Sequence, residues 1–111
     1  MTCKRGEIAL VRFVFADEEG AKRRPVLIVS TEAYHRARSD VVVATLRSNV
    51  TRLLPGDHLI ARWQEAGLPK PSVVTAVVRT IKASMIERSF GVLDRRDLRA
   101  YSDGLRPLLG L

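Results

Sequence analysis

The chain has 111 residues, of which 46% are hydrophobic and only 5% aromatic. This length suits one domain, 1–111, with a small core built mainly from Val, Leu and Ile. The formal net charge of +7 indicates a polyanionic partner, with nucleic acid first and an acidic protein second; a merely basic surface is the alternative.

Several classes of protein are excluded by the composition. Cys3 is the only cysteine, so an intrachain disulfide is impossible, and the two histidines, His35 and His58, lack the spacing of metal ligands. No stretch approaches the roughly 18 apolar residues of a membrane span. Residues 1–10 enter a strand pattern without a signal-peptide core. We therefore expect a cytoplasmic protein without a cofactor.

Strand patterns dominate the first half of the chain. Residues 7–15 alternate with the period of a strand, and an acidic turn follows at 16–20. Apolar, β-branched runs predict strands at 26–29 and 40–46, with a short helical turn at 34–38 between them. One face of the first strand is predicted to carry Ala9, Val11, Phe13 and Phe15.

The second half continues with strands and ends in a helix. Strands are predicted at 58–63, 72–78 and 85–92, with a proline-rich loop at 64–71. Asp94 is the expected N-cap of a terminal helix, which Pro107 should end near residue 105. The residues expected to share the buried face of this helix are Leu98, Tyr101 and Leu105.

These elements predict a mainly β fold. Five or six short strands with one terminal helix are typical of a small closed or nearly closed β-barrel, which removes sheet edges by closure or by pairing with a second copy.

The residue types that remain are sufficient for one kind of chemistry. The chain has no Gly-rich phosphate loop and no serine elbow, but it has many arginines. RNA carries its own nucleophile, the 2′-hydroxyl, so a protein need only align it and stabilise charge on the phosphoryl oxygens. Arg24 and Arg47 stand at the edges of apolar runs, where a rigid strand could aim a guanidinium at phosphate. Solvated charges at strand ends are the alternative.

An ordered set of motifs resembles the MazF/PemK family of toxin endoribonucleases from type II toxin–antitoxin systems. An opening strand is followed by an Arg-Pro pair before an apolar strand, then by a third strand ending in Ser-Asn. A fourth strand comes after Gly-Leu, and a Gly-Val-Leu leads into the final helix. The matching segments are 5–11, 24–30, 41–49, 67–81 and 91–93.

The resemblance implies an SH3-like β-barrel of the MazF/PemK/CcdB type with a C-terminal α-helix. It also implies a homodimer that binds single-stranded RNA along the dimer interface and cleaves it sequence-selectively, without metal, by attack of the 2′-OH. A cognate antitoxin with an acidic, partly disordered tail is the implied protein partner. Both partners agree with the positive charge.

The family's catalytic residues carry over unevenly. The arginine before proline falls on Arg24, the expected phosphate clamp. The family's Thr-Ser pair after the third strand falls on Arg47 and Ser48, so an arginine replaces the threonine and could either add a cation or block the pocket. Thr45, two residues earlier, could point the same way because a strand has period two. We predict a catalytic set of Arg24, Ser48, Arg47 and Thr45.

Further residues are predicted to contact RNA. In the acidic turn, Glu19 or Asp17 occupies a position where relatives often carry Glu or His, and Glu19 or Asp17 could also assist as a base. The predicted RNA-binding residues are Glu19, Lys22, Arg23, Asn49, Arg79, Thr80 and Lys82.

Two departures keep other functions open. The fourth strand lacks the Arg and Asp that some relatives use as an acid–base pair, and Arg47 replaces the usual threonine. Both favour the alternative of a non-catalytic protein with the toxin fold, either a gyrase poison or a decayed homologue that binds antitoxin or nucleic acid. An unrelated small barrel that binds nucleic acid is a third interpretation.

Overall fold

The computed structural model describes residues 3–14 and 20–111. Phe15, Asp17 and Glu19, for which predictions were made above, lie outside these residues. In chain order the elements are β1 (Glu7–Val14), β2 (Ala21–Ile28), α1 (Glu32–Ala37), β3 (Asp40–Arg47), β4 (His58–Leu59), β5 (Val73–Lys82), the 3-10 turn η1 (Ala83–Met85), β6 (Ile86–Val92) and α2 (Arg95–Leu109).

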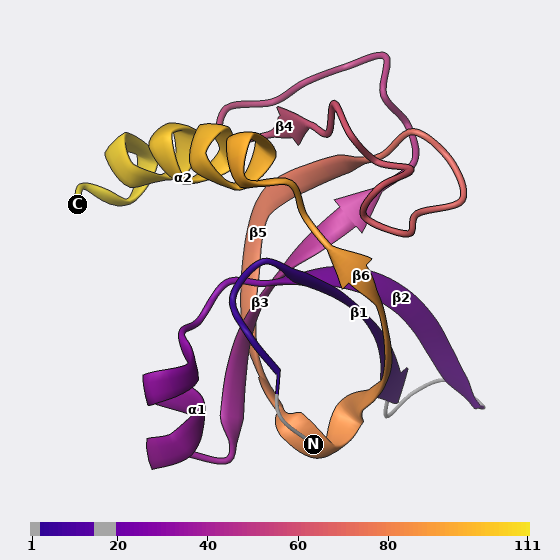
Figure 1. Cartoon of the computed structure of the whole chain (residues 1–111), viewed down its shortest axis with the longest axis vertical. Coiled ribbons are helices and arrows are strands. Elements are labelled where there is room, and N and C mark those ends of the chain that lie inside the picture. The colour runs from indigo at the N-terminus through magenta and orange to yellow at the C-terminus, as the bar shows by residue number, and fades with distance from the viewer. Residues whose placement is uncertain (1–2, 15–19) are drawn as a thin grey trace.

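The six strands form one antiparallel sheet in the order β4-β5-β3-β2-β1-β6. Figure 1 shows the sheet curled strongly on itself, with α2 lying across one end and α1 near the other. Among the described residues no ladder joins β4 to β6, so the curl is not a hydrogen-bonded ring. The predicted mainly β, SH3-like barrel with a C-terminal helix is confirmed in this half-barrel form.

Both faces of the central strands are buried, which explains their continuous apolar sequence. Val26, Leu27 and Ile28 are all 0% exposed. Val26 and Ile28 pack with Ala9, Val11 and Phe13 in one core cluster, as the period of the first strand predicts. Leu27 points the other way, into a second cluster under α2. The curl therefore encloses one core and the helix covers the other.

Helix α2 covers the second core with the face that the sequence predicts. Asp94 caps it by accepting a hydrogen bond from the backbone N–H of Arg96. Tyr101 and Leu105 are buried, and Leu98 packs partly buried beside them. The Tyr101 hydroxyl donates to the carbonyl of Thr75 at 2.9 Å, and burial raises the pKa of Tyr101 to about 12. The helix is thus fixed to β5 by packing and by one buried hydrogen bond.

The prediction that Pro107 ends this helix near residue 105 is wrong. The helix continues through Pro107 to Leu109, and contacts of its last turn offset the loss of the proline N–H. Gly110, at φ 74°, then closes the last turn by donating to the carbonyls of Arg106 and Pro107. This turn also has a packing partner, since a Cβ at Gly56 would lie 3.0 Å from Leu108 Cδ2.

Three strand boundaries also differ from the predictions. The strand expected at 26–29 begins at Ala21, because β2 pairs with β1 from Ala21 opposite Val14. The strand expected at 58–63 has only the two residues of β4, because the chain turns immediately afterwards and the N–H of Ala66 bonds to the carbonyl of Arg62. The strand expected at 72–78 extends to Lys82, since Asp40 at the start of β3 pairs with Lys82. Tertiary pairing, rather than local sequence, therefore sets these strand boundaries.

A buried carboxylate joins the start of α2 to the segment after β4. Asp97 accepts hydrogen bonds from the backbone N–H groups of Ala61 at 2.9 Å and Arg62 at 3.0 Å, and its Oδ1 lies 2.7 Å from His58 Nε2. Burial alone would raise the pKa of Asp97, but the bonds from Ala61, His58 and Arg62 together outweigh it and lower the pKa.

Replacing this carboxylate should reduce stability in a pH-dependent way. Asp97→Asn leaves at least one buried donor without an acceptor, so we expect a loss of about 1–3 kcal/mol in the free energy of unfolding at pH 7. Because the pKa is lowered in the folded state, the carboxylate stabilises fully above its unfolded pKa, about 3.9, and loses this effect as pH falls through the folded pKa. Urea unfolding at several pH values measures both.

The matched control is Asp103→Asn on the exposed side of the same helix, where the carboxylate is 64% exposed. It should change stability by less than about 0.5 kcal/mol. A difference between wild type and Asp97→Asn that stays constant from pH 7 to pH 2 would contradict the assigned role.

Candidate functional site

A groove beside the middle of β2 and the end of β3 brings together three of the four predicted catalytic residues, Arg24, Arg47 and Ser48. The cavity has a volume of about 360 Å³. It is lined by Arg24, Pro25, Leu46, Arg47, Ser48, Leu68, Pro69, Lys70 and Ser72.

Local strand pairing opens this groove. The ladder between β2 and β3 begins at Val26 opposite Thr45, so Pro25 lies where β2 has only β1 as its neighbour. A proline is tolerated there because no ladder on that side needs its missing N–H. Arg24 comes directly before it, opposite Val11 of β1.

Arg24 brings an unpaired guanidinium to the groove. Its side chain is exposed, and it forms no hydrogen bond or ion pair with another residue in the described part of the chain. It stands on β2, whose residues Val26 to Ile28 are completely buried, so its backbone is held rigidly. A guanidinium in this position can bind the oxygens of a phosphate bidentately.

Arg47 lines the same groove, but its guanidinium is occupied. Nε donates to the carbonyl of Asn49 at 3.1 Å, and Nη2 donates to the carbonyl of Arg52. Nη1 lies 2.7 Å from Asp57 Oδ2, and the Asp57 side chain is only 3% exposed. Arg47 therefore closes the loop 48–57 on itself. The sequence did not indicate these partners.

Ser48 is exposed beside Arg47, whereas Thr45 does not line the groove. The Thr45 hydroxyl is instead 2.7 Å from the hydroxyl of Thr75 on β5. The expectation that Thr45 and Arg47 share a side assumed regular alternation, but the register of β3 against β5 shifts between Ala44 and Leu46. Such an irregularity interrupts the alternation of side chains.

The predicted RNA-binding residues are spread over the surface. Lys22 and Arg23 lie on the exposed start of β2, and Arg23 Nε is paired with Glu87 at 2.9 Å. Asn49 lines an adjoining cavity, described below. Glu19 lies outside the described residues. Among the described members of this set, only Asn49 therefore lines a cavity that adjoins the groove.

Three more predicted residues, Arg79, Thr80 and Lys82, lie towards the far end of β5. Arg47 pairs with Val73, whereas Lys82 pairs with Asp40 nine residues further along the strand, a distance of roughly 30 Å. The Arg79 guanidinium is 4.8 Å from the centre of the Phe13 ring. Lys82 Nζ is 3.1 Å from Asp40 Oδ1, and this bond, with that from Arg38, lowers the pKa of Asp40. These three residues do not reach the groove of their own subunit.

Two residues of the groove were missed by the sequence analysis. Lys70 belongs to the loop predicted at 64–71, and Ser72 was predicted only as the first residue of the strand 72–78. The Ser72 hydroxyl donates to the carbonyl of Lys70 at 3.0 Å. A lysine between two prolines, Pro69 and Pro71, was the available signal, since prolines stiffen the backbone that carries it. Lys70 adds a second exposed cation to the groove.

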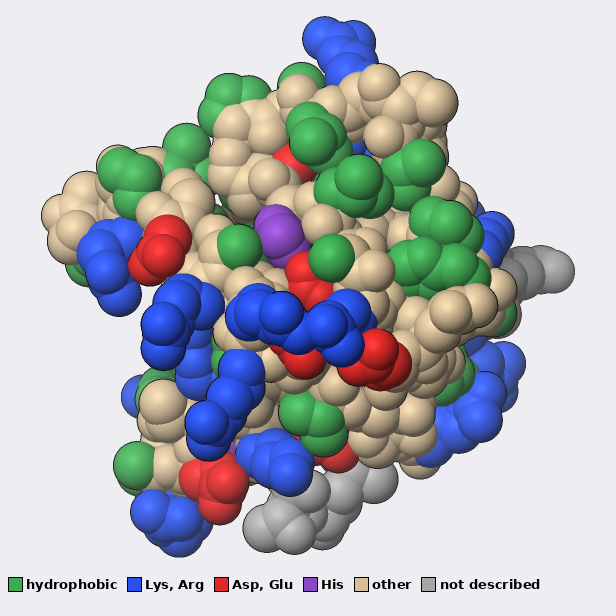
Figure 2. Space-filling view, turned by 45° about the horizontal axis from the view of Figure 1, so that its top comes forward, with side chains coloured by type: hydrophobic (Ala, Val, Ile, Leu, Met, Phe, Trp, Pro, Cys, Tyr) green, Lys and Arg blue, Asp and Glu red, His purple; other side chains and the backbone are tan. Residues whose placement is uncertain are grey.

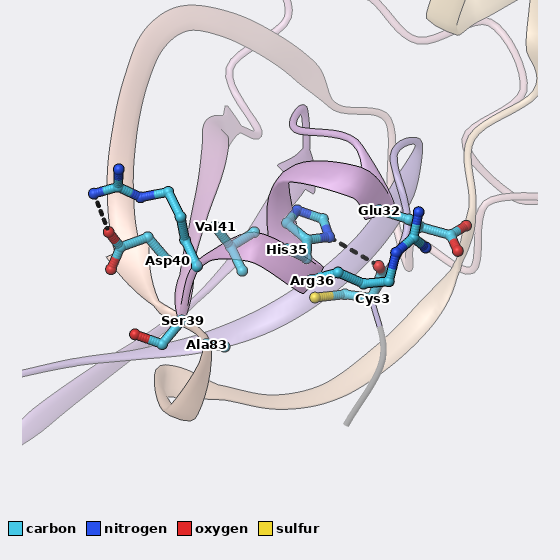
Figure 3. A pocket seen from close by; sticks show the side chains of 9 residues that line it. Cys3, Glu32, His35, Arg36, Ser39, Asp40, Val41 and Ala83 are labelled. Atoms are coloured by element: carbon cyan, nitrogen blue, oxygen red, sulfur yellow. Dashed lines mark hydrogen bonds and ion pairs between the residues drawn. The ribbon is translucent and has the colours of Figure 1, made fainter.

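A separate cavity of about 340 Å³ lies between α1 and the N-terminal segment (Figure 3). His35 lines it, and its ring lies between two partners: Nδ1 is 3.0 Å from the carbonyl oxygen of Cys3, and Nε2 is 2.5 Å from the Ser30 hydroxyl. Burial raises the pKa of the Cys3 thiol, which disfavours the reactive thiolate. This cavity contains none of the predicted site residues.

The surface agrees with an anionic partner. Figure 2 shows Lys and Arg side chains gathered in a band across one face of the molecule. On α2, Arg95, Arg96 and Arg99 are all exposed. Within residues 3–14 and 20–111, no helix is long and apolar enough to cross a membrane.

Comparison with known proteins places the chain in a family. Residues 4–109 match the family described as PemK-like, MazF-like toxin of type II toxin-antitoxin system. Endoribonuclease MazF2 of Mycobacterium bovis is 33% identical over 95 residues, which are 82% of this chain and 82% of that protein. Endoribonuclease MazF6 of Mycobacterium tuberculosis gives the same values.

Solved structures agree with this assignment. Mycobacterium tuberculosis toxin MazF-mt6 superposes with a TM-score of 0.72 at 26% identity, over 95% of this chain and 97% of that chain. The fold is also shared by a MazE–MazF crystal structure from Deinococcus radiodurans, with a TM-score of 0.82 at 20% identity over 100% and 99% of the two chains. With the match over nearly its whole length, the chain belongs to the PemK/MazF-like toxin family of type II toxin–antitoxin systems.

Proposed function

We propose that this chain is a toxin endoribonuclease that cleaves single-stranded RNA sequence-selectively and without a metal. The observation that carries the proposal is the unpaired guanidinium of Arg24, held on a rigid strand in a groove that also contains Ser48 and Lys70. The related MazF2 and MazF6 proteins are named endoribonucleases, which supports the same activity here.

The chemistry needs little from the protein. The ribose O2′ attacks the adjacent phosphorus, the P–O2′ bond forms as the P–O5′ bond breaks, and the proton of the 2′-hydroxyl is transferred to the departing 5′ oxygen. The products are a 2′,3′-cyclic phosphate and a 5′-hydroxyl end, with no water consumed. Arg24 stabilises the charge that builds on the non-bridging oxygens, since preorganised donors act most strongly where charge develops.

Ser48 and Lys70 have supporting roles in this proposal. The Ser48 hydroxyl, exposed in the groove, takes the place of the family's threonine as a hydrogen-bonding group beside the phosphate. Lys70 attracts the RNA backbone as a point charge. Catalytic contributions from Arg47 and Thr45, and RNA contacts from Lys22, Arg23, Glu19, Arg79, Thr80 and Lys82, stay predictions.

The protein partners of the family belong to the same proposal. We infer a cytoplasmic homodimer that is neutralised by an acidic antitoxin. Exposed apolar side chains on β5 and at the end of α2 support self-association, with Val77 59% and Leu108 49% exposed. Related toxins have been solved in complex with a cognate antitoxin or with MazE, and the net charge of +7 suits an acidic partner.

Cleavage of a long single-stranded RNA in excess EDTA tests the activity. Wild-type protein should produce discrete fragments with cyclic phosphate ends. Arg24→Ala should reduce kcat/KM at least about a hundredfold, as loss of one charge-stabilising donor does. Gel mapping of the fragments and single-turnover rates measure both effects.

The matched control is Arg36→Ala, which removes an exposed arginine of α1 outside the groove. It should leave the rate unchanged. Wild-type rates in Arg24→Ala would refute the role of Arg24. Intact RNA with the wild-type protein would favour the alternative of a non-catalytic toxin-fold protein, for which the occupied guanidinium of Arg47 is the specific observation.

Salt dependence separates binding from chemistry. An RNA with a 2′-deoxyribose at the cleavage position lacks the nucleophile, so it should bind without being cut. For a single strand, each neutralised phosphate contributes a slope of about −0.7 to the plot of log affinity against log salt concentration. Arg24→Ala should make this slope shallower by about 0.7, as measured by fluorescence anisotropy. An unchanged slope would show that Arg24 does not contact a phosphate.

A further inference from the structure

Arg47 stands between two adjoining cavities. On one side lies the groove with Arg24 and Ser48. On the other lies a cavity of about 280 Å³ lined by Arg47, Asn49, Arg52 and Leu54. Arg47 alone of the described residues lines both, so its side chain forms the wall that the two cavities share.

The guanidinium of Arg47 bonds to three residues of the loop 48–57. It donates to two loop carbonyls, those of Asn49 and Arg52, and pairs with Asp57. The same Asp57 oxygen accepts from the N–H of Leu54 at 2.8 Å, and the N–H of Asp57 donates back to the carbonyl of Leu54 at 3.0 Å. Each wall residue of the second cavity is thus bonded to Arg47 directly or through Asp57.

The far end of the loop is fixed by packing. Gly56 has φ +86°, and a Cβ at this position would lie 2.7 Å from the Cβ of Ala76 on β5. The loop therefore packs on the sheet at Gly56, and Arg47 holds its first part, residues 49–54. Removing Arg47 would free only this first part of the loop, which lines the second cavity.

The chemistry of the second cavity suits a nucleobase. Asn49 Oδ1 accepts from the backbone N–H and the hydroxyl of Thr51, at 3.1 and 2.7 Å, which leaves its amide NH₂ to donate to a ligand. An amide oriented in this way can read the edge of an unpaired base. Leu54, 50% exposed, offers an apolar surface to the ring, and the exposed Arg52 offers a cation to the backbone.

We propose that Arg47 is a positioning residue that holds the loop 48–57 as the wall of a nucleotide subsite beside the Arg24 groove. It thereby determines which base is accepted next to the cleaved phosphate, and it does not itself stabilise the reacting phosphoryl group. A phosphate bound at Arg47 would compete with a carboxylate that is almost fully buried, and losing its cation would leave that charge uncompensated. The inference rests on the proposed function, because it assigns a specificity role within the same RNA site.

The test compares variants on a pool of single-stranded RNAs with randomised sequence around one cleavage site. Arg47→Thr removes the clamp, Asp57→Asn weakens its ion pair while keeping an acceptor for Leu54, and Asn49→Ala removes the base-reading amide. Arg36→Thr, an exposed arginine of α1, is the matched control. Sequencing of the fragments gives the base preference, and kinetics on the preferred RNA give kcat and KM separately.

All three loop variants should lose preference at the same nucleotide position. For Arg47→Thr we expect kcat/KM on the preferred RNA to fall roughly tenfold to a hundredfold, mainly through KM, with kcat within about threefold of wild type. Hydrogen exchange at the Leu54 amide should accelerate in Arg47→Thr and Asp57→Asn, because the loop opens. The control should behave as wild type.

Two results would overturn the inference. One is an unchanged base preference in folded Arg47→Thr and Asp57→Asn. The other is a hundredfold fall in kcat with unchanged KM and preference, which would make Arg47 catalytic. If Arg47→Thr does not fold, Asp57→Asn and Asn49→Ala decide. If the wild-type protein cuts no RNA, the proposed function fails and the inference is tested by binding. The RNAs bound by each variant are then sequenced, and an unchanged base preference in Arg47→Thr would overturn the role of Arg47.

Discussion

Burial of both faces of β2 and β3 is the constraint on which the rest of the molecule depends. Val26, Leu27 and Ile28 are fully enclosed, because the sheet curls over one face and α2 covers the other. A charged side chain cannot enter the buried part of such a strand without a large desolvation cost, so the cations of β2 lie in its first half, before Val26. The groove lies where β2 and β3 stop pairing, and it is there that Arg24 reaches solvent on a rigid backbone.

The arginines of the chain divide by the partners that the fold offers them. Arg5 donates to the carbonyl of Val29 and to the Ser102 hydroxyl, and Arg47 closes a loop, so both guanidinium groups serve the structure. Arg24 has no such partner among the described residues and keeps its donors for a ligand. The net charge alone does not distinguish paired arginines from unpaired ones. Identical side chains acquire structural or chemical roles through the carbonyls and carboxylates that the folded chain brings to them.

An arginine at position 47, where the resemblance implies a threonine, is understandable in these terms. A threonine could not reach the carbonyl of Arg52 or the carboxylate of Asp57, which the longer guanidinium bonds at once. The substitution therefore exchanges a hydroxyl in the groove for a fixed loop beside it. Asp57 depends on Arg47 in turn, since a nearly buried carboxylate without a cation would be costly.

The sequence by itself determined the strand faces, the buried face of α2 and the position of Arg24 before proline, because these follow from side-chain period and from local backbone preference. The register shift that turns Thr45 away, the partners of Arg47 and Asp97, and the arrival of Lys70 in the groove were decided only by the tertiary structure. Each depends on segments distant along the chain meeting across the curled sheet. Local sequence patterns do not specify such long-range contacts, since these contacts stabilise the chain only after the sheet has curled around its cores.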